Sequence, residues 1–576
     1  MERREIRESG VDAVYWRPVR DALAELVTEL SPEDIEQLLD TPPDPSLGDV
    51  AFPTFRLAKE RRRPPAEIAR TIAEALSARG FSARADGGYV NVALPRTAAV
   101  RDILRETAAP DFARFSWGAG KRVVIDMSSP NIAKPFGVGH LRSTVIGQAI
   151  RNLLLRARYE VLRVNHIGDW GTQFGKLMAA YAMWGIPEGA SDKIRAYLEL
   201  YVRFHEEAER RPELEDEGRR WFKRLEDGDP QARKLWRMFV DESLKEFMRI
   251  YDRLGVSFEY ILGESFYNDQ IPGVLEEVRA KGLLEESEGA FVVRLGDDLP
   301  PALLLKSDGT TLYLTRDLAT ALYRKNVLGG DLLLYVVGRE QSLHFEQLRG
   351  VLRRMGYPWA DAIVHVPFGL LRFGGKKLST RRGRVIFLEE VLDEAKARAL
   401  QILEEKSPHL ADKEGVAEAI GVGAVIFNDL RQSRLHDIDF DMEEALSFEG
   451  ETGPYVQYTY ARAKSLFRRA GAACEEALAD VLPDVRAIAG DRGWELLKLV
   501  AAYPRAVRKG IELYEPSAVA RHILDVAKAF NRYYQEERIL VEDPEERRAK
   551  LALVARVARV LADGLDVLGL KVLEEI

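Results

Sequence analysis

The first hundred residues alternate between helix-like and strand-like patterns. Residues 14–27 and 66–80 carry apolar side chains at helical spacing, and the second of these stretches ends at a glycine suited to a helix end. Residues 89–94 alternate as a half-buried strand does. The proline, aspartate and glycine content of 41–53 predicts a loop. Together these patterns predict a small α+β domain over residues 1–108.

A strand–loop–helix–strand pattern follows. Residues 121–127 form a β-branched run typical of a buried strand, and a loop rich in proline and glycine covers 128–139. Residues 140–157 have helical periodicity, and 160–168 predict the next strand. This order is the start of a parallel α/β sheet, in which a nucleotide crevice lies beyond the carboxyl ends of the strands. We therefore expect an α/β domain over 109–385.

Helical patterns dominate the rest of the chain. The charge-dense stretch around 190–255 predicts a solvated helical insertion within the α/β domain, while 333–341 and 364–371 read as further strands. We assign 386–450 to a connecting helical segment and 451–576 to an all-α domain. Breaks between helices are expected near Pro408, Gly453 with Pro454, Pro483, Pro504 and Pro516.

Composition narrows the class of protein. The 576 residues are 46% hydrophobic and 31% charged, which is ordinary for a globular protein and excludes disorder, collagen or coiled coil for the bulk of the chain. We see no apolar run of the ~18 residues that a membrane helix needs, and no secretory signal in the charged N-terminal residues. The single cysteine, Cys474, permits neither an internal disulfide nor a cysteine-based zinc site. We expect a cytoplasmic protein with no membrane partner and no structural zinc.

Net charge neither indicates nor excludes nucleic acid as a partner. The value of −8 differs from the strongly basic balance of many nucleic-acid-binding proteins. A large acidic protein can nevertheless carry one basic face, because charge is often segregated into local patches.

The loop before the helix at 140–157 is the first stretch with recognisable chemistry. Gly137 and Gly139 allow a ligand to approach the backbone, and His140 stands at the helix start, where free N–H groups and the helix dipole favour phosphate. A tight turn with a capping histidine explains this loop equally well on its own. A second loop, 374–384, combines two glycines with several lysines and arginines, including Lys377. It can close over a polyphosphate, although a basic surface loop is by itself the commoner explanation.

Taken together, the two loops resemble the HIGH and KMSKS signatures of class I aminoacyl-tRNA synthetases. Longer stretches resemble the arginyl-tRNA synthetase family in particular, and they cover essentially the whole chain. These stretches are FPTFRLAK (52–59), GYVNVAL (88–94), SSPNIAKPFGVGHLRSTVIG (128–147), NHIGDWGTQFGKL (165–177), YLTRDLATALYR (313–324), YVVGREQSLHFEQL (335–348) and GPYVQYTYARAKSL (453–466).

The resemblance implies a domain order and a reaction. It implies an N-terminal domain that binds the tRNA elbow near the D-loop, a Rossmann-like catalytic domain, a stem-contact segment and a helical anticodon-binding domain. The activity implied is arginine–tRNA ligation from L-arginine, arginine tRNA and ATP with Mg²⁺, without a prosthetic group or a resident metal. A monomer is expected. The resemblance also predicts that arginine activation requires bound tRNA.

The resemblance further implies which residues contact ATP. They are Gly137, Gly139, His140, His344, Lys377 and Ser379. The chain departs from the signatures at Gly137, where the family usually has histidine, and at Thr380, where the second lysine of KMSKS is expected. We hypothesise that Lys134 supplies the positive charge lost at Gly137 and acts with His140 and Lys377 in catalysis. A solvated loop lysine is the alternative.

An arginine substrate presents a planar guanidinium with five donors, so a selective pocket needs a carboxylate and fixed acceptors. Tyr313 and Asp317 are one helical turn apart and share a face. By resemblance, Asp317 pairs with the guanidinium while Tyr313 and Gln341 orient it, and Asp126 and Asn131 hold the α-amino end. Most family members have glutamate in place of Asp126. Without the resemblance, a surface ion pair between Asp317 and Arg316 is the simpler interpretation.

Candidate tRNA contacts lie in both terminal domains. Arg56 and Lys59 belong to a basic run in the N-terminal domain, for which a solvated helix edge is the alternative. In the C-terminal domain, Arg462 and Arg469 are candidates for phosphate contacts, and Tyr533 for a contact with an unstacked base. A buried helix contact competes for the tyrosine.

A catalytically silent tRNA-binding paralogue is the competing hypothesis. Gly137 is the feature that favours it. Retention of the other predicted substrate contacts argues for an active enzyme; these are His140, Asp317, Gln341, Lys377 and Ser379.

Overall fold

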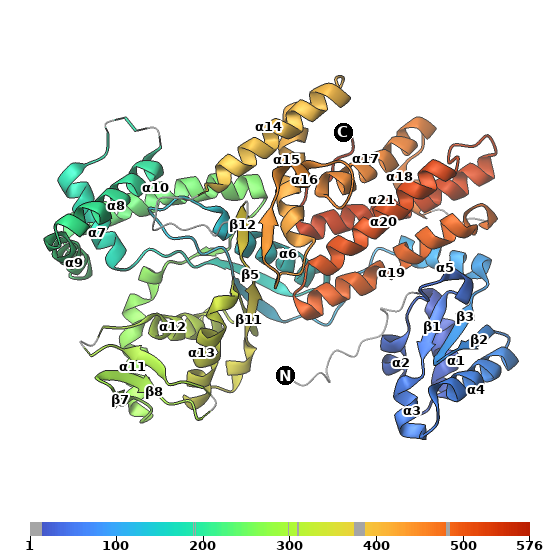
Figure 1. The fold of residues 1–576 in the computed structure, drawn as a ribbon, viewed down its shortest axis with the longest axis horizontal. Coiled ribbons are helices and arrows are strands. Elements are labelled where there is room, and N and C mark those ends of the chain that lie inside the picture. The colour runs from blue at the N-terminus through green and yellow to red at the C-terminus, as the bar shows by residue number, and fades with distance from the viewer. Residues whose placement is uncertain are drawn as a thin grey trace.

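The computed structural model describes residues 14–187, 189–190, 192–297, 299–307, 310–373, 386–479 and 484–576. Figure 1 shows a central parallel sheet with a helical insertion on one side, C-terminal helices on the other, and the N-terminal domain beside the far end of those helices. The fold class predicted from the sequence is confirmed: an α+β domain, a Rossmann-like domain and an all-α domain follow one another. No helix of the described residues is long and apolar enough to cross a membrane.

The N-terminal domain packs helices against a three-stranded antiparallel sheet of order β1-β3-β2. The stretch 41–53 was expected to be a loop, but its end forms β1, because Val50 and Phe52 are buried and pair with β3. The elements are α1 (Arg17–Leu26), α2 (Pro32–Leu38), β1 (Val50–Pro53), α3 (Phe55–Arg61), α4 (Pro65–Ala78), β2 (Ser82–Asp86), β3 (Tyr89–Ala93) and α5 (Arg96–Ala108).

The α/β domain is built on five parallel strands in the order β11-β10-β4-β5-β6. The chain moves outward from β4 to β6 on one side and then returns to place β10 and β11 on the other. The order therefore reverses between β4 and β10, and ligands of such sheets bind beyond the carboxyl ends at this point. The strands are β4 (Arg122–Asp126), β5 (Glu160–Asn165), β6 (Tyr260–Ile261), β10 (Leu332–Gly338) and β11 (Ile363–Phe368).

The crossover segments differ greatly in size. α6 (Leu141–Arg156) connects β4 to β5, and four helices intervene between β5 and β6. A small antiparallel sheet of three strands, which the sequence did not predict, precedes α12. The remaining elements of this domain are α7 (Thr172–Trp184), α8 (Lys193–Arg210), α9 (Glu213–Glu226), α10 (Pro230–Leu254), α11 (Ile271–Ala280), β7 (Glu285–Ser287), β8 (Ala290–Val293), β9 (Ala302–Leu305), α12 (Tyr313–Asn326), α13 (Ser342–Arg354) and β12 (Leu371–Phe373).

In the described residues from 386 onward, the regular elements are helices apart from β13, which pairs in parallel with β12. A break was expected at Pro504, but α19 continues through it, and this buried proline is held by packing in the helix interior. Pro483 lies outside the described residues. The elements are α14 (Leu388–Lys406), α15 (Lys413–Leu430), β13 (Ile438–Phe440), α16 (Met442–Leu446), α17 (Gly453–Ala470), α18 (Cys474–Ala479), α19 (Asp491–Leu513), α20 (Ser517–Glu536) and α21 (Pro544–Leu568).

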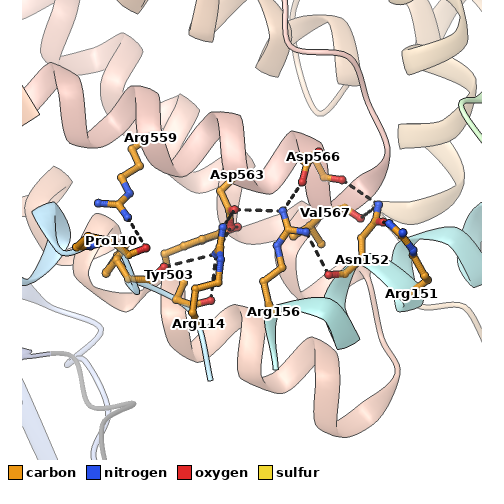
Figure 2. A network of polar contacts seen from close by, with 12 residues as sticks. Pro110, Arg114, Arg151, Asn152, Arg156, Tyr503, Arg559, Asp563, Asp566 and Val567 are labelled. Atoms are coloured by element: carbon orange, nitrogen blue, oxygen red, sulfur yellow. Dashed lines mark hydrogen bonds and ion pairs between the residues drawn. The ribbon is translucent and has the colours of Figure 1, made fainter. Parts of the chain in front are cut away.

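A polar joint around Asp563 of α21 ties three parts of the chain together (Figure 2). Its carboxylate accepts hydrogen bonds from Arg114 of the interdomain linker at 2.6 Å, from Tyr503 of α19 at 2.7 Å and from Arg156 of α6 at 3.2 Å. Burial opposes the charge of Asp563, but Arg156 and Arg114 outweigh it and hold its pKa below the usual range. The last helix is thereby fixed to the helix that follows the glycine–histidine loop.

Candidate active site

The candidate site lies where the strand order reverses, at the carboxyl ends of β4, β5 and β10. Asp126 is the last residue of β4, and Tyr335 is its register partner on β10. Loops leave the sheet here in the directions of α6, the helical insertion and α13. The crevice therefore gathers residues that are far apart in the sequence.

The loop between β4 and α6 is held in an unusual conformation. Ser128, Ser129 and Ala133 all have positive φ, at 73°, 52° and 57°, which costs free energy for residues with a side chain. Neighbouring elements fix it: Ser243 Oγ of α10 accepts from the Ala133 backbone N–H at 2.7 Å, and Tyr251 Oη lies 2.7 Å from Ser128 Oγ. The helical insertion thus supports the loop predicted to bind phosphate.

His140 stands at the start of α6, as the sequence predicted. Its ring packs edge-on against Phe136 at 5.2 Å, and its Nδ1 is buried without a hydrogen-bond partner among the described residues. Burial lowers the pKa of His140 to about 4, with a further contribution from the charge of Lys134. The imidazole is therefore neutral near pH 7. A Cβ on Gly139 would meet nothing within 4 Å, so the turn is open on that side.

Lys134 lies between the predicted ATP loop and the insertion. Its ammonium is 5.3 Å from the centre of the Tyr201 ring on α8, and its charge acts on both His140 and His205. The charge of Lys134 thus acts on His140, the retained histidine of the signature. This position agrees with the hypothesis that Lys134 replaces the charge lost at Gly137. Lys377 and Ser379 fall outside the described residues, so their predicted roles stay predictions.

The predicted guanidinium pocket is carried by the first turn of α12 and the residues after β10. Tyr313 opens α12 and is 67% exposed, while Asp317 is one turn further along. Asp317 Oδ2 lies 2.6 Å from His344 Nε2, so a residue predicted to contact ATP is found against the carboxylate predicted to bind arginine. Gln341 is exposed at the end of the 3₁₀ turn that follows β10. The structure therefore brings Asp317 and His344, which were predicted from two separate motifs, into contact.

Asp126 already has partners within the protein. Its Oδ1 accepts from Ser129 Oγ at 2.9 Å, and its Oδ2 is 2.7 Å from Nη1 of Arg324, which is buried in α12. The sequence analysis missed Arg324, because a basic residue in the last turn of a helix is ordinarily a solvated one. If Asp126 binds the α-amino group of the substrate, it does so while it is also paired with Arg324.

Asn131 is exposed at the edge of the crevice and forms a parallel backbone bridge with Gly168, in the loop after β5. A Cβ at Gly168 would lie 2.1 Å from Asn131 Oδ1, so the glycine is needed to admit this side chain. The structure thus couples the loop after β4 to the loop after β5.

Glu264 is a candidate that sequence reasoning missed. It follows β6 at the start of a 3₁₀ helix (Glu264–Gln270), and its Oε2 is buried without a hydrogen-bond partner among the described residues. Burial raises its pKa to about 7, although Arg316 opposes the shift and Asp169 and Asp317 add to it. The signal available in the sequence was its place directly after a strand of the parallel sheet. Glu264 and Asp317 give the crevice two carboxylates that act on one another.

His166 and Asp169 follow β5. His166 is half-buried and Asp169 is buried. Ser265 donates to the Asp169 carboxylate through its backbone N–H at 2.8 Å and its Oγ at 2.6 Å. Burial lowers the pKa of His166 and raises that of Asp169. Both residues shape the crevice wall. The described residues contain no cluster of three or more His, Cys, Asp or Glu side chains able to hold a metal ion.

Three family models match successive parts of the chain. A model described as tRNA synthetases class I (R), catalytic domain, matches residues 109–442; a DALR anticodon binding domain matches 456–576; and an arginyl tRNA synthetase N terminal domain matches 17–94. The chain belongs to the arginyl-tRNA synthetase family.

Relatives in this family match along nearly their full length. The arginine–tRNA ligase of Ligilactobacillus salivarius is 50% identical over 548 residues, covering 94% of this chain and 96% of its own. That of Enterococcus faecalis is 48% identical over 570 residues, covering 98% and 99%. The structure of Thermus thermophilus arginyl-tRNA synthetase superimposes with a TM-score of 0.82 at 28% identity, covering 97% of this chain and 100% of that one.

A cavity of about 670 Å³ lies between α14 of the connecting segment and α17 and α20 of the domain matched by the anticodon-binding model. Arg462 lies in it between the rings of Tyr458 and Tyr534, at 4.9 and 5.0 Å, and donates to Asn531. Arg469 is exposed further along α17. The prediction for Tyr533 is wrong: its side chain is 1% exposed and belongs to the helical core, so it offers no face to a base.

The N-terminal domain of this chain presents a basic and aromatic surface. Arg56 and Lys59 are exposed on α3, and Arg56 forms an ion pair with Asp34 at 2.9 Å. Beside Arg56, the exposed rings of Phe55 and Tyr89 pack edge to face at 5.3 Å. Exposed aromatic rings next to cations suit contacts with unstacked bases.

Proposed function

We propose that the chain is an arginine–tRNA ligase, which activates L-arginine with ATP and transfers it to the terminal ribose of arginine tRNA. The observation that carries the substrate assignment is the acidic crevice at the point where the strand order reverses, in which Asp317 lies 2.6 Å from His344 and its charge acts on Glu264. The close relatives, which are named arginine–tRNA ligases, support the same reaction.

The pocket chemistry favours a guanidinium over an ammonium. Two carboxylates and the amide of Gln341 can accept several of the five guanidinium donors in a plane. A lysine ammonium would leave acceptors unpaired in a partly buried site, which produces strong rejection without a separate editing step. The contact with His344 at 2.6 Å keeps the Asp317 carboxylate oriented.

Activation joins the arginine carboxylate to the α-phosphorus of ATP and releases pyrophosphate. The ribose hydroxyl of the tRNA then attacks the acyl carbon, and AMP leaves. No protein nucleophile is needed, so the chain acts by orienting reactants and neutralising phosphate charge. In our proposal the amino end of α6 receives the phosphates, the neutral His140 hydrogen-bonds them, and Lys134 supplies positive charge. Mg²⁺ arrives with ATP and keeps much of its water shell.

The two terminal domains would bind the tRNA. In our proposal, Arg56 and Lys59 contact phosphates near the elbow, and the cavity around Arg462 admits an anticodon base. Arg469 would contact the backbone nearby. We expect a monomeric, cytoplasmic enzyme whose arginine activation requires bound tRNA.

The test is ATP–pyrophosphate exchange with arginine or lysine, each with and without arginine tRNA, followed by charging of that tRNA. We expect exchange with arginine and none above background with lysine, and we expect exchange to depend on tRNA. Exchange at full rate without tRNA would contradict the activation order alone. Folded, tRNA-binding protein that neither exchanges nor charges would instead indicate a silent paralogue.

A further inference from the structure

The loop after β4 begins with a strained turn. Ser128 and Ser129 are consecutive residues with positive φ, at 73° and 52°. Residues with a side chain disfavour this left-handed conformation, and two in a row persist only where the surrounding structure determines them. The same loop carries Asn131, Gly137 and His140, which are predicted substrate contacts. The conformation of the turn therefore sets where those contacts lie.

The hydroxyl of Tyr251 on α10 is at the centre of the contacts that hold this turn. Tyr251 is fully buried, and its Oη lies 2.7 Å from Ser128 Oγ. The same oxygen accepts a hydrogen bond from Asn165 Nδ2 at 2.9 Å, and Asn165 Oδ1 accepts one from the Ser129 backbone N–H at 3.2 Å. One hydroxyl therefore acts on both left-handed residues, on Ser128 directly and on Ser129 through the buried amide of Asn165.

The contacts of Ser128 extend to the start of α6. Ser128 Oγ lies 2.9 Å from Thr144 Oγ1, which is 2.7 Å from the carbonyl oxygen of His140. The Ser128 backbone N–H donates to Ser143 Oγ at 2.9 Å. A shift of the turn would thus reach the predicted phosphate site as well as the predicted contact with the α-amino group.

α10 meets the loop at two further points. Ser243 Oγ accepts from the Ala133 backbone N–H at 2.7 Å, and Glu246 Oε1 accepts from the Phe136 backbone N–H at 3.3 Å. These contacts lie further along the loop, whereas Tyr251 acts at the two consecutive left-handed residues. Loss of the Tyr251 hydroxyl would therefore release the turn and leave the rest of the loop attached to α10.

We infer that Tyr251 is a positioning residue for arginine activation, because its hydroxyl holds Ser128 and Ser129 in the left-handed conformation that aligns the predicted substrate contacts. Its ring is fixed independently, edge-on against Phe136 at 5.4 Å and against Phe258 at 4.8 Å. The ring can therefore stay in place when the hydroxyl is removed. The inference rests on the proposed function for its kinetic test, and on the geometry of the loop for a test that needs no substrate.

Amide hydrogen exchange of the free protein tests the loop directly. Tyr251→Phe removes the hydroxyl and keeps the ring, so peptides covering residues 127–136 should exchange about tenfold faster while peptides from β10 and α20 stay unchanged. Tyr197→Phe is the matched control and should leave the loop unchanged. Tyr197 is a buried tyrosine of α8 in the same insertion, and its ring packs against Phe239 at 4.9 Å. Exchange that rises equally throughout the chain, or does not rise in the loop, would overturn the inference.

Two variants at Ser128 test the strain without altering Tyr251. Ser128→Ala and Ser128→Gly both remove the hydroxyl that Tyr251 contacts, but only glycine adopts a positive φ without cost. In ATP–pyrophosphate exchange with arginine tRNA present, kcat/KM for arginine should fall about tenfold in Ser128→Ala and about threefold at most in Ser128→Gly. Equal losses in these two variants would contradict the role of the strain.

The double variant distinguishes positioning from general stability. Tyr251→Phe should lower kcat/KM for arginine about tenfold, and Tyr251→Phe/Ser128→Gly should recover most of that loss, because the turn no longer needs the hydroxyl. If Tyr251 only stabilised the fold, a second lost hydrogen bond would add to the damage. A double variant no more active than Tyr251→Phe would therefore overturn the inference.

Wild-type activity separates this inference from the proposed function. If wild type exchanges pyrophosphate while the loop peptides and the Ser128 variants show none of these differences, only the role of Tyr251 fails. If wild type neither exchanges nor charges tRNA, the proposed function fails, and hydrogen exchange in the loop still decides whether Tyr251 holds the turn.

Discussion

The Asp563 joint and the active-site crevice use the same residue types in opposite ways. At the joint, Asp563 is buried and saturated, with Arg114, Arg156 and Tyr503 all bound to it. In the crevice, Glu264 is buried with an oxygen unpartnered among the described residues, and the pKa of that carboxyl is raised to about 7. Native proteins rarely leave buried charge unsatisfied, so such groups indicate a ligand, whereas saturated groups hold the architecture.

Asp126 shows that position alone does not make this distinction. It stands at the end of the first strand of the sheet in chain order, where ligands bind, yet both of its oxygens already have a partner within the protein, Ser129 and Arg324. Arg324 belongs to α12, the helix that also carries Tyr313 and Asp317. The pair therefore fastens the helix that carries the predicted arginine contacts to the sheet, and we class Asp126 with the structural carboxylates as much as with the predicted substrate contacts.

The largest expected effect is at Asp317. Asp317→Asn keeps the shape of the side chain but removes the charge facing the guanidinium, so kcat/KM for arginine should fall about 10³-fold. ATP–pyrophosphate exchange over a range of arginine concentrations measures it. Asp361→Asn is the matched control, because Asp361 is an exposed carboxylate paired with Arg353 on the same domain. A decrease below tenfold would remove Asp317 from the guanidinium site.

Asp563→Asn should affect stability and not arginine recognition. Removing the charge leaves Arg114 and Arg156 without a buried partner, which we expect to cost about 3 kcal/mol of unfolding free energy. Because the folded-state pKa of Asp563 is lowered, this stabilisation is present above its unfolded pKa and is lost as pH falls through the folded value. Denaturant unfolding at neutral and acidic pH should therefore show a difference from wild type that shrinks in acid.

The control for the joint is kinetic. If Asp563→Asn left stability unchanged but raised KM for arginine, the joint would belong to the site, and the contrast between saturated and unsaturated groups would be wrong. A folded Asp563→Asn variant with the wild-type KM for arginine and a lowered denaturation midpoint would support the contrast between the two kinds of group.

Lys134 is expected to have an intermediate effect. Lys134→Ala removes a charge that acts on His140 at the predicted phosphate site, so adenylate formation should slow about 10- to 100-fold with little change in KM for arginine. Lys134→Arg keeps the charge and should recover most of the rate. Wild-type exchange rates in Lys134→Ala would show that Lys134 is only a partner of Tyr201.

The sequence predicted the sheet well, because β4, β5, β10 and β11 are β-branched or apolar runs with local signals. It also selected His140, Asp317 and Gln341 from long motifs, and their roles toward the substrates stay predictions. It missed the partner of Asp126, since Arg324 is almost two hundred positions away and nothing local marks a cation as buried. It misplaced Tyr533 for the related reason that helical spacing does not say which face of α20 meets the core.

The smallest and most discriminating prediction concerns pH. With a pKa of about 7, Glu264 is half protonated in the free enzyme near neutrality, and only its ionised form attracts a guanidinium. The value of kcat/KM for arginine should therefore rise several-fold between about pH 6 and 8. Glu264→Gln should flatten this rise while lowering the plateau. Because a raised carboxyl pKa makes the folded state less stable as pH increases, the same variant should gain stability relative to wild type above pH 7. An unchanged pH profile in Glu264→Gln would show that Glu264 has only a structural role. A buried carboxylate without a hydrogen-bond partner would then not indicate the ligand site.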